Sequence, residues 1–393
     1  MRILGEEKKT EGIGVYVHIP FCRSKCPYCD FASVTTPAAE EEYTDCLLKE
    51  LSAFLRDGAA RSRALESIYI GGGTPSLFSP ASIARIIKAI KAAFSPCASC
   101  EVTIEANPES IDKAFLSGCI DAGMNRLSIG FQSLDDNELK TLGRAHTAKQ
   151  AVAAFASARK AGFGNIGVDL ISGVPGQTVG SLCASLSKVM ELRPEHLSLY
   201  GLTYEEGTPM TKERAAGRFN GLLPSEEEEE EMYLRPASML AQGGFLHYEV
   251  SNWALPGFES RHNSRYWLGK DYIGLGASAH SFISSPRWGR RWWNEPSAGK
   301  YMERIRKSGE ARSGFEELGR QEAMTESLFL GLRMIKGGLK GAPFRERFGL
   351  LPKEAFKGCA EMEGRGLIRS SGDDLFLTER GVLLSNGLFL EMV

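Results

Sequence analysis

The sequence lacks the segments that carry proteins into or across membranes. Its 393 residues contain no run of about 18 apolar residues, the length that a membrane-spanning helix needs. The N-terminal residues 1–14 are charged and lack the apolar stretch of a secretory signal. We therefore expect no transmembrane segment and a cytoplasmic location.

A positive charge excess and a disulfide framework are also absent. The 47 basic and 49 acidic residues leave a formal net charge of -2, whereas phosphate contacts to nucleic acid require a basic excess. No nucleic-acid partner is therefore expected. The nine cysteines are odd in number, and a reducing compartment keeps thiols free. Any clustered subset of them therefore favours metal or redox chemistry.

What the sequence does contain is an alternation of strand and helix patterns. Hydrophobic residues make up 42% of the chain, which is enough for a buried core. Short runs rich in β-branched and aromatic residues are each followed by a longer amphipathic stretch, a pattern that predicts parallel strands with crossover helices. The expected fold class is α/β, a partial (β/α)6 TIM-like barrel with functional loops at the carboxyl ends of its strands. These strands are predicted at residues 13–19, 67–70, 102–105, 126–129, 167–171 and 196–200.

The pattern changes in the last quarter of the chain, which predicts a second domain. We place a core barrel at residues 1–290 and a C-terminal domain at residues 297–393. In the second domain, amphipathic stretches at 323–335 and 353–365 precede a short hairpin at 366–377. Helices followed by a hairpin predict a small, mainly helical, winged-helix-like domain. Its balanced charge favours a packing or substrate-lid role over nucleic-acid binding.

Three cysteines lie together in the loop after the first predicted strand. Cys22, Cys26 and Cys29 can converge on one site if the backbone wraps around it. Thiolates are soft ligands suited to zinc, copper(I) or iron–sulfur clusters. A closed zinc site requires four ligands, whereas three thiolates on a four-iron cluster leave one iron open to an exchangeable ligand. A zinc site and three unrelated buried cysteines are the alternatives.

The residues around these cysteines resemble a known superfamily. Tyr16-Val-His-Ile-Pro-Phe-Cys22 leads into Cys26-Pro-Tyr-Cys29-Asp-Phe, which is similar to the radical S-adenosylmethionine superfamily and, within it, to the oxygen-independent coproporphyrinogen III oxidase group. The resemblance implies a [4Fe-4S] cluster on the three cysteines, with the amine and carboxylate of S-adenosyl-L-methionine on the open iron. In that superfamily, electron transfer from the reduced cluster yields a 5′-deoxyadenosyl radical. Whether this chain turns the cofactor over or only binds it stays open, and so does enzymatic activity.

The resemblance also assigns cofactor-binding residues. Gly71-Gly-Gly-Thr-Pro75 follows a predicted strand, where glycines allow the backbone to approach a ligand closely. Taken alone, this segment fits a tight turn as well as a binding loop. Carboxylates at the strand ends can accept from ribose hydroxyls or an amine, and an arginine can pair with a carboxylate. For these charged residues, ordinary salt bridges are the alternative. The implied cofactor-binding residues are Tyr16, Tyr28, Gly72, Gly73, Thr74, Glu105, Gln132, Arg144 and Asp169.

Two departures distinguish the sequence from the oxidase pattern. Phe31 stands where the oxidase has a further cysteine. In addition, 21 residues precede Cys22, where the oxidase has a longer extension that shapes its porphyrinogen site. Both features resemble instead the heme-chaperone branch of the group, HemW.

A second segment also resembles that branch. His262-Asn-Ser-Arg-Tyr266-Trp267 is similar to the His-Asn-x-x-Tyr-Trp motif of HemW proteins, which implies heme contact through His262, Tyr266 and Trp267. A histidine can ligate heme iron, and aromatic rings can cover a porphyrin face. The alternative is that these residues pack a loop against the barrel mouth. The competing histidines for the iron are His247 and His280.

The resemblance implies a heme chaperone that binds heme and an S-adenosylmethionine-coordinated [4Fe-4S] cluster and transfers heme to an acceptor protein. The alternative is an oxygen-independent coproporphyrinogen III oxidase, which acts by radical decarboxylation, or a radical enzyme that degrades heme. A nucleic-acid-modifying radical protein would require a basic face on residues 297–393, which the sequence does not plainly show. The expected partners are heme and an acceptor protein that the sequence does not identify. A homodimer is also considered.

Overall fold

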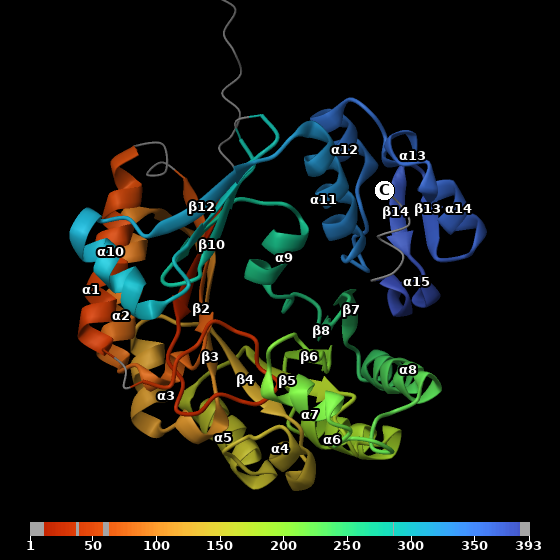
Figure 1. Ribbon diagram of the computed structural model, residues 1–393, viewed down its shortest axis with the longest axis horizontal. Helices are drawn as coiled ribbons and strands as arrows, with labels where there is room; N and C mark the ends of the chain where they lie inside the picture. The colour runs from red at the N-terminus through yellow and green to blue at the C-terminus, as the bar shows by residue number, and fades with distance from the viewer. Residues whose placement is uncertain (1–11, 37–38, 58–62, 286, 386–393) are drawn as a thin grey trace, which may run out of the picture.

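The computed structural model describes residues 12–36, 39–57, 63–285 and 287–385. Its main feature is one twelve-stranded mixed sheet that curves around a central lumen, with helices on the outside (Figure 1). In sheet order the strands are β12 (Arg312–Glu317), β11 (Arg290–Asn294), β10 (His280–Ile283), β9 (Tyr272–Leu275), β1 (Ile13–Ile19), β2 (Ala64–Gly72), β3 (Ser95–Ala106), β4 (Arg126–Gln132), β5 (Ile166–Ser172), β6 (His196–Gly201), β8 (Asn252–Ala254) and β7 (Leu246–Glu249).

The middle of this sheet is parallel and its ends are antiparallel. Strands β9 and β1 to β6 run in one direction, and the outer strands on either side are added antiparallel. The helices of this part are α1 (Glu40–Phe54), α2 (Pro80–Ala93), α3 (Lys113–Asp121), α4 (Asp136–Thr141), α5 (Ala148–Ala161), α6 (Val179–Glu191), α7 (Pro209–Ala215), α8 (Glu226–Gln242), α9 (Arg261–Trp267) and α10 (Ala298–Ser308). No helix in the described ranges is long and apolar enough to cross a membrane.

The two faces of the parallel strands differ in their chemistry. On β4, Leu127 and Ile129 belong to the apolar core, whereas Arg126, Ser128 and Gly130 line the lumen. This alternation follows from the two-residue period of a strand. The interior of a closed TIM barrel is filled by branched apolar side chains. A lumen lined by polar and small residues is suited instead to hold a ligand.

All six predicted strands are present as β1 to β6, and the α/β fold class with a partial TIM-like barrel is confirmed. Strands β7 to β12 were not predicted. They are three to six residues long, so no hydrophobic period develops along them. On the edge strand β12, five of the six residues are exposed, which removes the alternation altogether.

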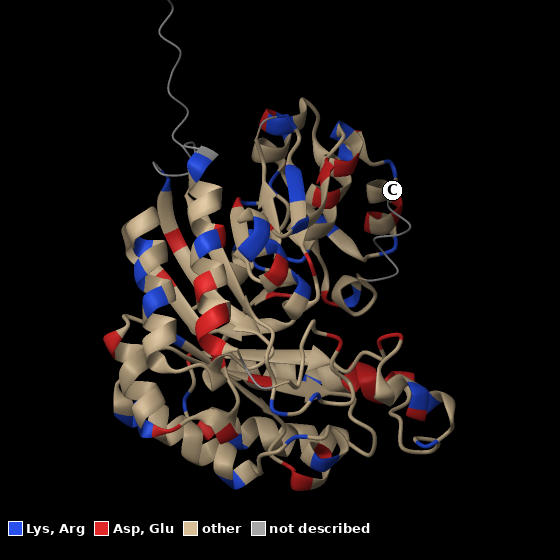
Figure 2. Ribbon diagram, turned by 60° about the vertical axis from the view of Figure 1, so that its left-hand side comes forward, with Lys and Arg blue, Asp and Glu red and all other residues tan. Residues whose placement is uncertain are grey.

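The last part of the described chain has its own apolar core. Its buried residues include Leu328, Phe344 and Met362. The predicted hairpin and a helix over most of the stretch at 323–335 are present, whereas the stretch at 353–365 forms two short helices in place of one. Both charge signs occur along these elements (Figure 2). The elements are α11 (Arg320–Leu332), α12 (Gly341–Phe348), α13 (Pro352–Ala355), α14 (Gly358–Gly364), β13 (Ile368–Ser371), β14 (Asp374–Leu377) and α15 (Glu379–Leu383).

The segment between the two cores bears on the domain boundary. Tyr301 and Ile305 of α10 are buried in the core of the barrel, and β12 pairs with β11 of the main sheet. The second core begins at Leu318. In place of a boundary at residues 290–297, we propose one near Leu318.

Candidate functional site

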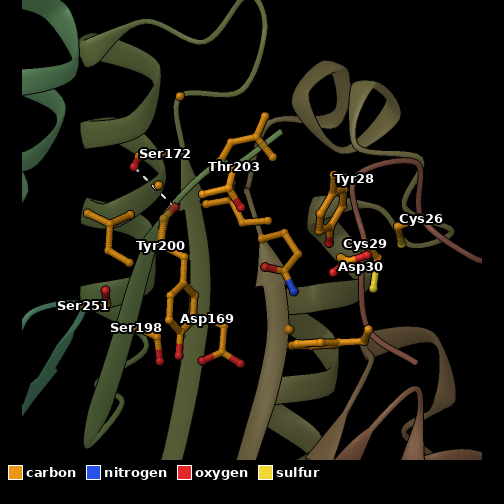
Figure 3. Close-up of a pocket in the computed structure, with 18 of the residues that line it drawn as sticks. Cys26, Tyr28, Cys29, Asp30, Asp169, Ser172, Ser198, Tyr200, Thr203 and Ser251 are labelled. Carbon is orange, nitrogen blue, oxygen red and sulfur yellow. Dashed lines mark hydrogen bonds between the residues drawn. The ribbon is translucent and has the colours of Figure 1, made fainter. Parts of the chain in front are cut away.

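A cavity of about 1210 Å³ occupies the lumen and extends to the second domain. The cysteine loop forms one side of its mouth, and strands β5 and β6 form the opposite wall. Figure 3 shows Asp169, Ser198 and Tyr200 projecting into the same space from that wall, with Tyr28 and Cys29 on the other side. Arg333 and Val382 of the second domain also line the cavity. Residues of both domains therefore line the cavity.

The cysteine loop is tied down by backbone hydrogen bonds near its ends. The Cys22 amide donates to the Val34 carbonyl at 2.9 Å, and the Val34 amide donates to the Pro20 carbonyl at 2.7 Å. Within the loop, the Cys29 amide donates to the Cys26 carbonyl at 3.1 Å. All three cysteine side chains line the cavity, as do the neighbouring residues Tyr28 and Asp30. The spacing of the cysteines therefore brings three thiols to one mouth.

Tyr16 supports this loop from behind. His18 donates from Nε2 to the Ala32 carbonyl at 2.8 Å, because a carbonyl can only accept. Its Nδ1 atom therefore accepts from the Tyr16 hydroxyl at 2.9 Å. Burial lowers the pKa of His18, which keeps the ring neutral. Tyr16 is absent from the cavity lining among the described residues, so its link to the cofactor region runs through His18.

The glycine segment after β2 packs directly against the cysteine loop. The Gly73 amide donates to the Ile19 carbonyl at 2.8 Å, and the Thr74 amide to the Phe21 carbonyl at 2.8 Å. A Cβ atom on Gly73 would lie 2.8 Å from the Phe21 carbonyl oxygen and 2.9 Å from Cys22 Sγ. Only glycine allows this approach, so the segment is a built part of the site and more than a tight turn.

A chain of hydrogen bonds connects two of the cysteines. The Thr74 hydroxyl lies 3.5 Å from Cys22 Sγ and accepts from Asn107 Nδ2 at 3.3 Å. Asn107 Oδ1 accepts from Arg144 Nη2 at 2.6 Å, and Arg144 Nη1 lies 3.5 Å from Cys26 Sγ. Asn107 was not among the predicted site residues. Its signal was its place directly after a predicted strand.

Two buried carboxyl groups face the lumen below this chain. Glu105 accepts from the Tyr69 hydroxyl at 2.6 Å and from the Gly72 amide at 3.1 Å. Burial raises the pKa of Glu105 to about 7. Asp169 accepts from the Ser128 hydroxyl at 3.2 Å, and burial raises its pKa as well. Each carboxyl can therefore bind a hydroxyl or an amine in either protonation state.

Gln132 closes the row of cofactor residues at the end of β4. Its φ angle is 65°, in the left-handed region that residues other than glycine seldom adopt. Its side chain lies over Gly130, where a Cβ atom would meet Gln132 Nε2 at 2.7 Å. Such backbone strain persists where the surrounding structure fixes a side chain for a purpose. The strain supports the predicted role of Gln132 in binding.

Comparisons with known proteins cover nearly the whole chain. The radical SAM superfamily matches residues 16–189, and the HemN C-terminal domain matches residues 318–384. A heme chaperone HemW from Bacillus subtilis is 36% identical over 382 residues, which are 95% of this chain and 97% of that protein. A heme chaperone HemW from Lactococcus lactis is 34% identical over 376 residues, which are 95% of each.

This chain belongs to the HemW family of radical SAM proteins. A mitochondrial radical S-adenosyl methionine domain-containing protein 1 from Bos taurus is 37% identical over 84% of this chain and 74% of its own length. The solved structure of coproporphyrinogen III oxidase (HemN) from Escherichia coli superimposes with a TM-score of 0.82 at 25% identity, over 97% of this chain and 89% of that one. Family membership thus supports the expected [4Fe-4S] cluster and S-adenosylmethionine.

The residues of this HemW family member fit that cluster. Each thiolate of a [4Fe-4S] cluster binds a different iron, so the sulfurs need not converge on one ion. In keeping with this, no three His, Cys, Asp or Glu side chains in the described ranges lie within reach of a single metal ion. Arg144 places a positive charge beside Cys26, which favours the negatively charged thiolate that a cluster binds. Burial raises the pKa of Cys29, so without a bound cluster this side chain keeps its proton.

The segment for which heme contact was predicted forms α9, inside the open side of the curved sheet (Figure 1). His262 is fully buried, and its Nδ1 and Nε2 atoms lie 2.8 Å from the hydroxyls of Ser67 and Tyr266. Iron coordination by either nitrogen would therefore require one of these bonds to break. Trp267 stacks under the Arg333 guanidinium at 4.4 Å, and Arg333 lines the cavity.

Eleven predicted residues line the cavity and four do not, counted within the described ranges. Those that line it are Cys22, Cys26, Tyr28, Cys29, Gly72, Gly73, Thr74, Glu105, Gln132, Arg144 and Asp169. Those that do not are Tyr16, His262, Tyr266 and Trp267. The second group lies behind the wall. Tyr16 and His262 stack on Tyr69, which lines the cavity. Trp267 stacks under Arg333, which lines it as well.

Proposed function

We propose that this HemW family member is a heme chaperone, which binds heme and transfers it to an acceptor protein. The observation that carries the proposal is the 34% to 36% identity to heme chaperones HemW over 95% of the chain. The cavity of about 1210 Å³ supports it. It exceeds the roughly 300–1,000 Å³ of common small-molecule sites, which leaves room for a macrocycle beside S-adenosylmethionine.

We assign the mouth of the cavity to the cluster and its cofactor. Cys22, Cys26 and Cys29 would hold three irons, and the fourth iron would take the amine and carboxylate of S-adenosylmethionine. When bound, the cluster supplies one electron for cleavage of the sulfonium. Arg144 and Thr74 orient the sulfur ligands through their contacts with Cys26 and Cys22. The remaining cavity-lining residues of the predicted set would bind the adenosyl and methionyl groups.

The test uses the anaerobically reconstituted full chain. We would titrate it with heme and, separately, incubate it with dithionite, S-adenosylmethionine and coproporphyrinogen III. The proposal predicts one heme per chain and no decarboxylated product. Absence of saturable heme binding would overturn it.

The second candidate is the oxidase, and the observation that favours it is the HemN likeness along 97% of this chain. Its identity of 25% is lower than that of the HemW relatives. Phe31 also stands where the oxidase pattern has a cysteine, and its ring is 65% exposed at the cavity mouth. Formation of decarboxylated product in the same incubation would make the oxidase reading the correct one.

For the heme iron we propose His262 as the ligand, with Tyr266 and Trp267 beside the macrocycle. Binding would release the bond from His262 Nε2 to the Tyr266 hydroxyl. The competitor His280 is exposed and stacks on Trp293 at 5.9 Å, outside the cavity lining. His262→Ala should change the absorption spectrum of bound heme, and His280→Ala should leave it unchanged. The opposite result would assign the iron to His280.

A cytoplasmic location and a homodimer belong to the same proposal. Cell fractionation checks the first. Light scattering with and without heme checks the second. Recovery in a membrane fraction, or a mass of one chain under both conditions, would contradict the respective prediction.

A further inference from the structure

The base of the lumen contains a buried cation, two of whose nitrogens have no hydrogen-bond partner among the described residues. Arg126, the first residue of β4, is 1% exposed, and its side chain lines the cavity. Its Nε and Nη1 atoms have no hydrogen-bond partner among the described residues. A buried charged donor carries a desolvation cost unless an acceptor reaches it. The cavity above it is the space from which such an acceptor would come.

The carboxylates around Arg126 are bonded to other donors. Glu101 accepts from two backbone amides of α9, each at 3.0 Å. Asp169 accepts from Ser128 at 3.2 Å, and Glu105 accepts from the tyrosine and glycine groups described above. These carboxylates balance the charge of Arg126 through space. They leave its N–H groups free for a further acceptor.

His196 adds a second donor at the same level. It is 1% exposed, and burial holds its pKa well below the ordinary value, so the ring is neutral. Its Nε2 atom lies 2.8 Å from the Tyr248 hydroxyl, which accepts from the Ser260 amide at 3.4 Å. In the tautomer with the ring proton on Nδ1, the Tyr248 hydroxyl donates to Nε2, and Nδ1 is a donor for the ligand. That Nδ1 atom has no partner among the described residues.

These donors surround one small point above Gly167. A Cβ atom at Gly167 would lie 3.3 Å from His196 Nδ1, 3.3 Å from Ser128 Oγ and 3.4 Å from Arg126 Nη2. The three side chains come from β4 and β6, on either side of the glycine in β5. Because residue 167 has no side chain, nothing from β5 separates these donors, and Arg126, Ser128 and His196 all line the cavity from which a ligand group would approach them.

We propose that this base is a carboxylate-binding subsite, in which Arg126 and His196 donate to the two oxygens of a carboxylate carried by the cavity's ligand. A planar monoanion matches the fork of a guanidinium. A dianionic phosphate would be repelled by the nearby Glu105 and Asp169. Burial raises the pKa of both, which lessens their repulsion of a single negative charge.

The subsite deepens the proposed function and rests on it, since the carboxylate is then a propionate of heme. The other source in the same cavity is the methionyl carboxylate of S-adenosylmethionine. That group belongs with the cysteine loop and Arg144 at the mouth, at the opposite end of the strands from Arg126 and His196. A propionate arm extends away from the macrocycle and can reach the base.

The deciding experiment compares heme with its dimethyl ester, in which both carboxylates are masked. We expect the wild-type chain to bind heme about tenfold more tightly than the ester, as one charge-assisted contact provides. Arg126→Met should remove this preference while binding the ester as the wild type does. Equal affinity of the wild type for heme and ester overturns the subsite, as does a parallel loss of both ligands in Arg126→Met.

Two further variants keep the test independent of folding. Gly167→Ala fills the point between the donors without removing a charge, and it should reduce the preference for heme in the same way. Arg85→Met removes an arginine that pairs with Glu41 and Asp45 on the outer surface, and it should keep the preference. If Gly167→Ala keeps the preference as well, the subsite is wrong.

The affinity for S-adenosylmethionine separates the two sources of the carboxylate. It should be unchanged in Arg126→Met. If it falls while the preference for heme persists, the propionate assignment is overturned. Failure of the wild-type chain to bind heme at all removes the proposed function and the subsite together. Binding of heme and its ester with equal affinity by the wild-type chain removes the subsite alone.

Discussion

At the mouth of the lumen a chain of hydrogen bonds joins the polar side chains, although Arg144 Nε has no partner among the described residues, whereas at the base Arg126 and His196 each keep unpartnered nitrogen. Thr74, Asn107 and Arg144 form a continuous chain between two cysteines. Arg126 Nε and Nη1 and His196 Nδ1 are buried without a partner among the described residues, and both side chains line the same cavity. The mouth is therefore ordered before anything binds, as a site with a resident cofactor requires. At the base, the unpartnered nitrogens of Arg126 and His196 gain an acceptor only when a ligand binds.

The largest expected effect is at the mouth. Cys26→Ala should abolish the cluster, because it removes one of three thiolates from a cluster that already has an open iron. Iron content per chain and the visible absorbance of the cluster measure this. Cys97→Ala is the control, since that thiol lies on β3 away from the cavity lining. Normal iron content in Cys26→Ala would show that the mouth is not the cluster site.

A second prediction concerns Glu105, which lies between the two regions. Its pKa rises from 4.5 to about 7 on burial. The folded state therefore keeps the proton while the unfolded state loses it, and stability falls as pH rises through this window, by about 3 kcal/mol at most. Glu105→Gln should flatten the dependence of the unfolding free energy on pH, as measured by denaturant titration at several pH values.

Glu50 provides the matched control for that change. Its pKa is also raised to about 7 by burial, but it lies on α1, outside the lumen, and bonds to Tyr301 and Asn294. Glu50→Gln should flatten the stability profile in the same way and leave S-adenosylmethionine binding unchanged. Only Glu105→Gln should weaken that binding. Equal effects of both variants on the cofactor would remove Glu105 from the site.

A third prediction tests the close contact between two loops at the mouth. Gly73→Ala inserts a Cβ atom 2.8 Å from the Phe21 carbonyl oxygen, so the cysteine loop must shift. Overpacking of this kind costs about 1–3 kcal/mol. We expect S-adenosylmethionine affinity to fall by tenfold or more. Gly164→Ala, which meets no atom within 4 Å, should bind normally. Normal S-adenosylmethionine binding by Gly73→Ala would show that the close contact between Gly73 and the cysteine loop is not needed for the cofactor site.

The smallest effect is expected at Asn107. Asn107→Ala breaks the link between Thr74 and Arg144, at a cost of about 1 kcal/mol for a lost hydrogen bond. The affinity for S-adenosylmethionine should fall several-fold, with heme binding unchanged. Asn107→Asp keeps the acceptor for Arg144 and should retain most of the affinity. Weaker heme binding by Asn107→Ala would contradict the assignment of cofactor binding to the mouth and heme carboxylate binding to the base.

The mouth could be predicted from the sequence because its parts are local. Cys22, Cys26 and Cys29 stand in one loop, and their spacing alone indicates a shared ligand. The six parallel strands were readable for the same reason, since the apolar residues that mark each strand lie within one short segment. Tyr16 was assigned to the cofactor by resemblance, but the structure places it behind His18.

The base could not be predicted because it depends on long-range contacts. Arg126 lies inside a predicted strand, but nothing in the sequence tells which carboxylates lie near it or that other donors occupy them. His196 is recognisable as a donor only once Tyr248 and Ser260 are placed beside it. Strands β7 to β12 escaped prediction because the segments are short, and on β12 the side chains are also mostly exposed.

The sheet that forms the lumen never closes, since β7 and β12 lie at opposite ends of the strand order. In a closed barrel the number and tilt of the strands set the diameter, so a wider ligand requires a rebuilt barrel. Here the gap is spanned by an appended unit, whose Arg333 and Val382 complete the wall. Over evolution, exchange of that unit could change the size and shape of the cargo while the cluster machinery is inherited intact.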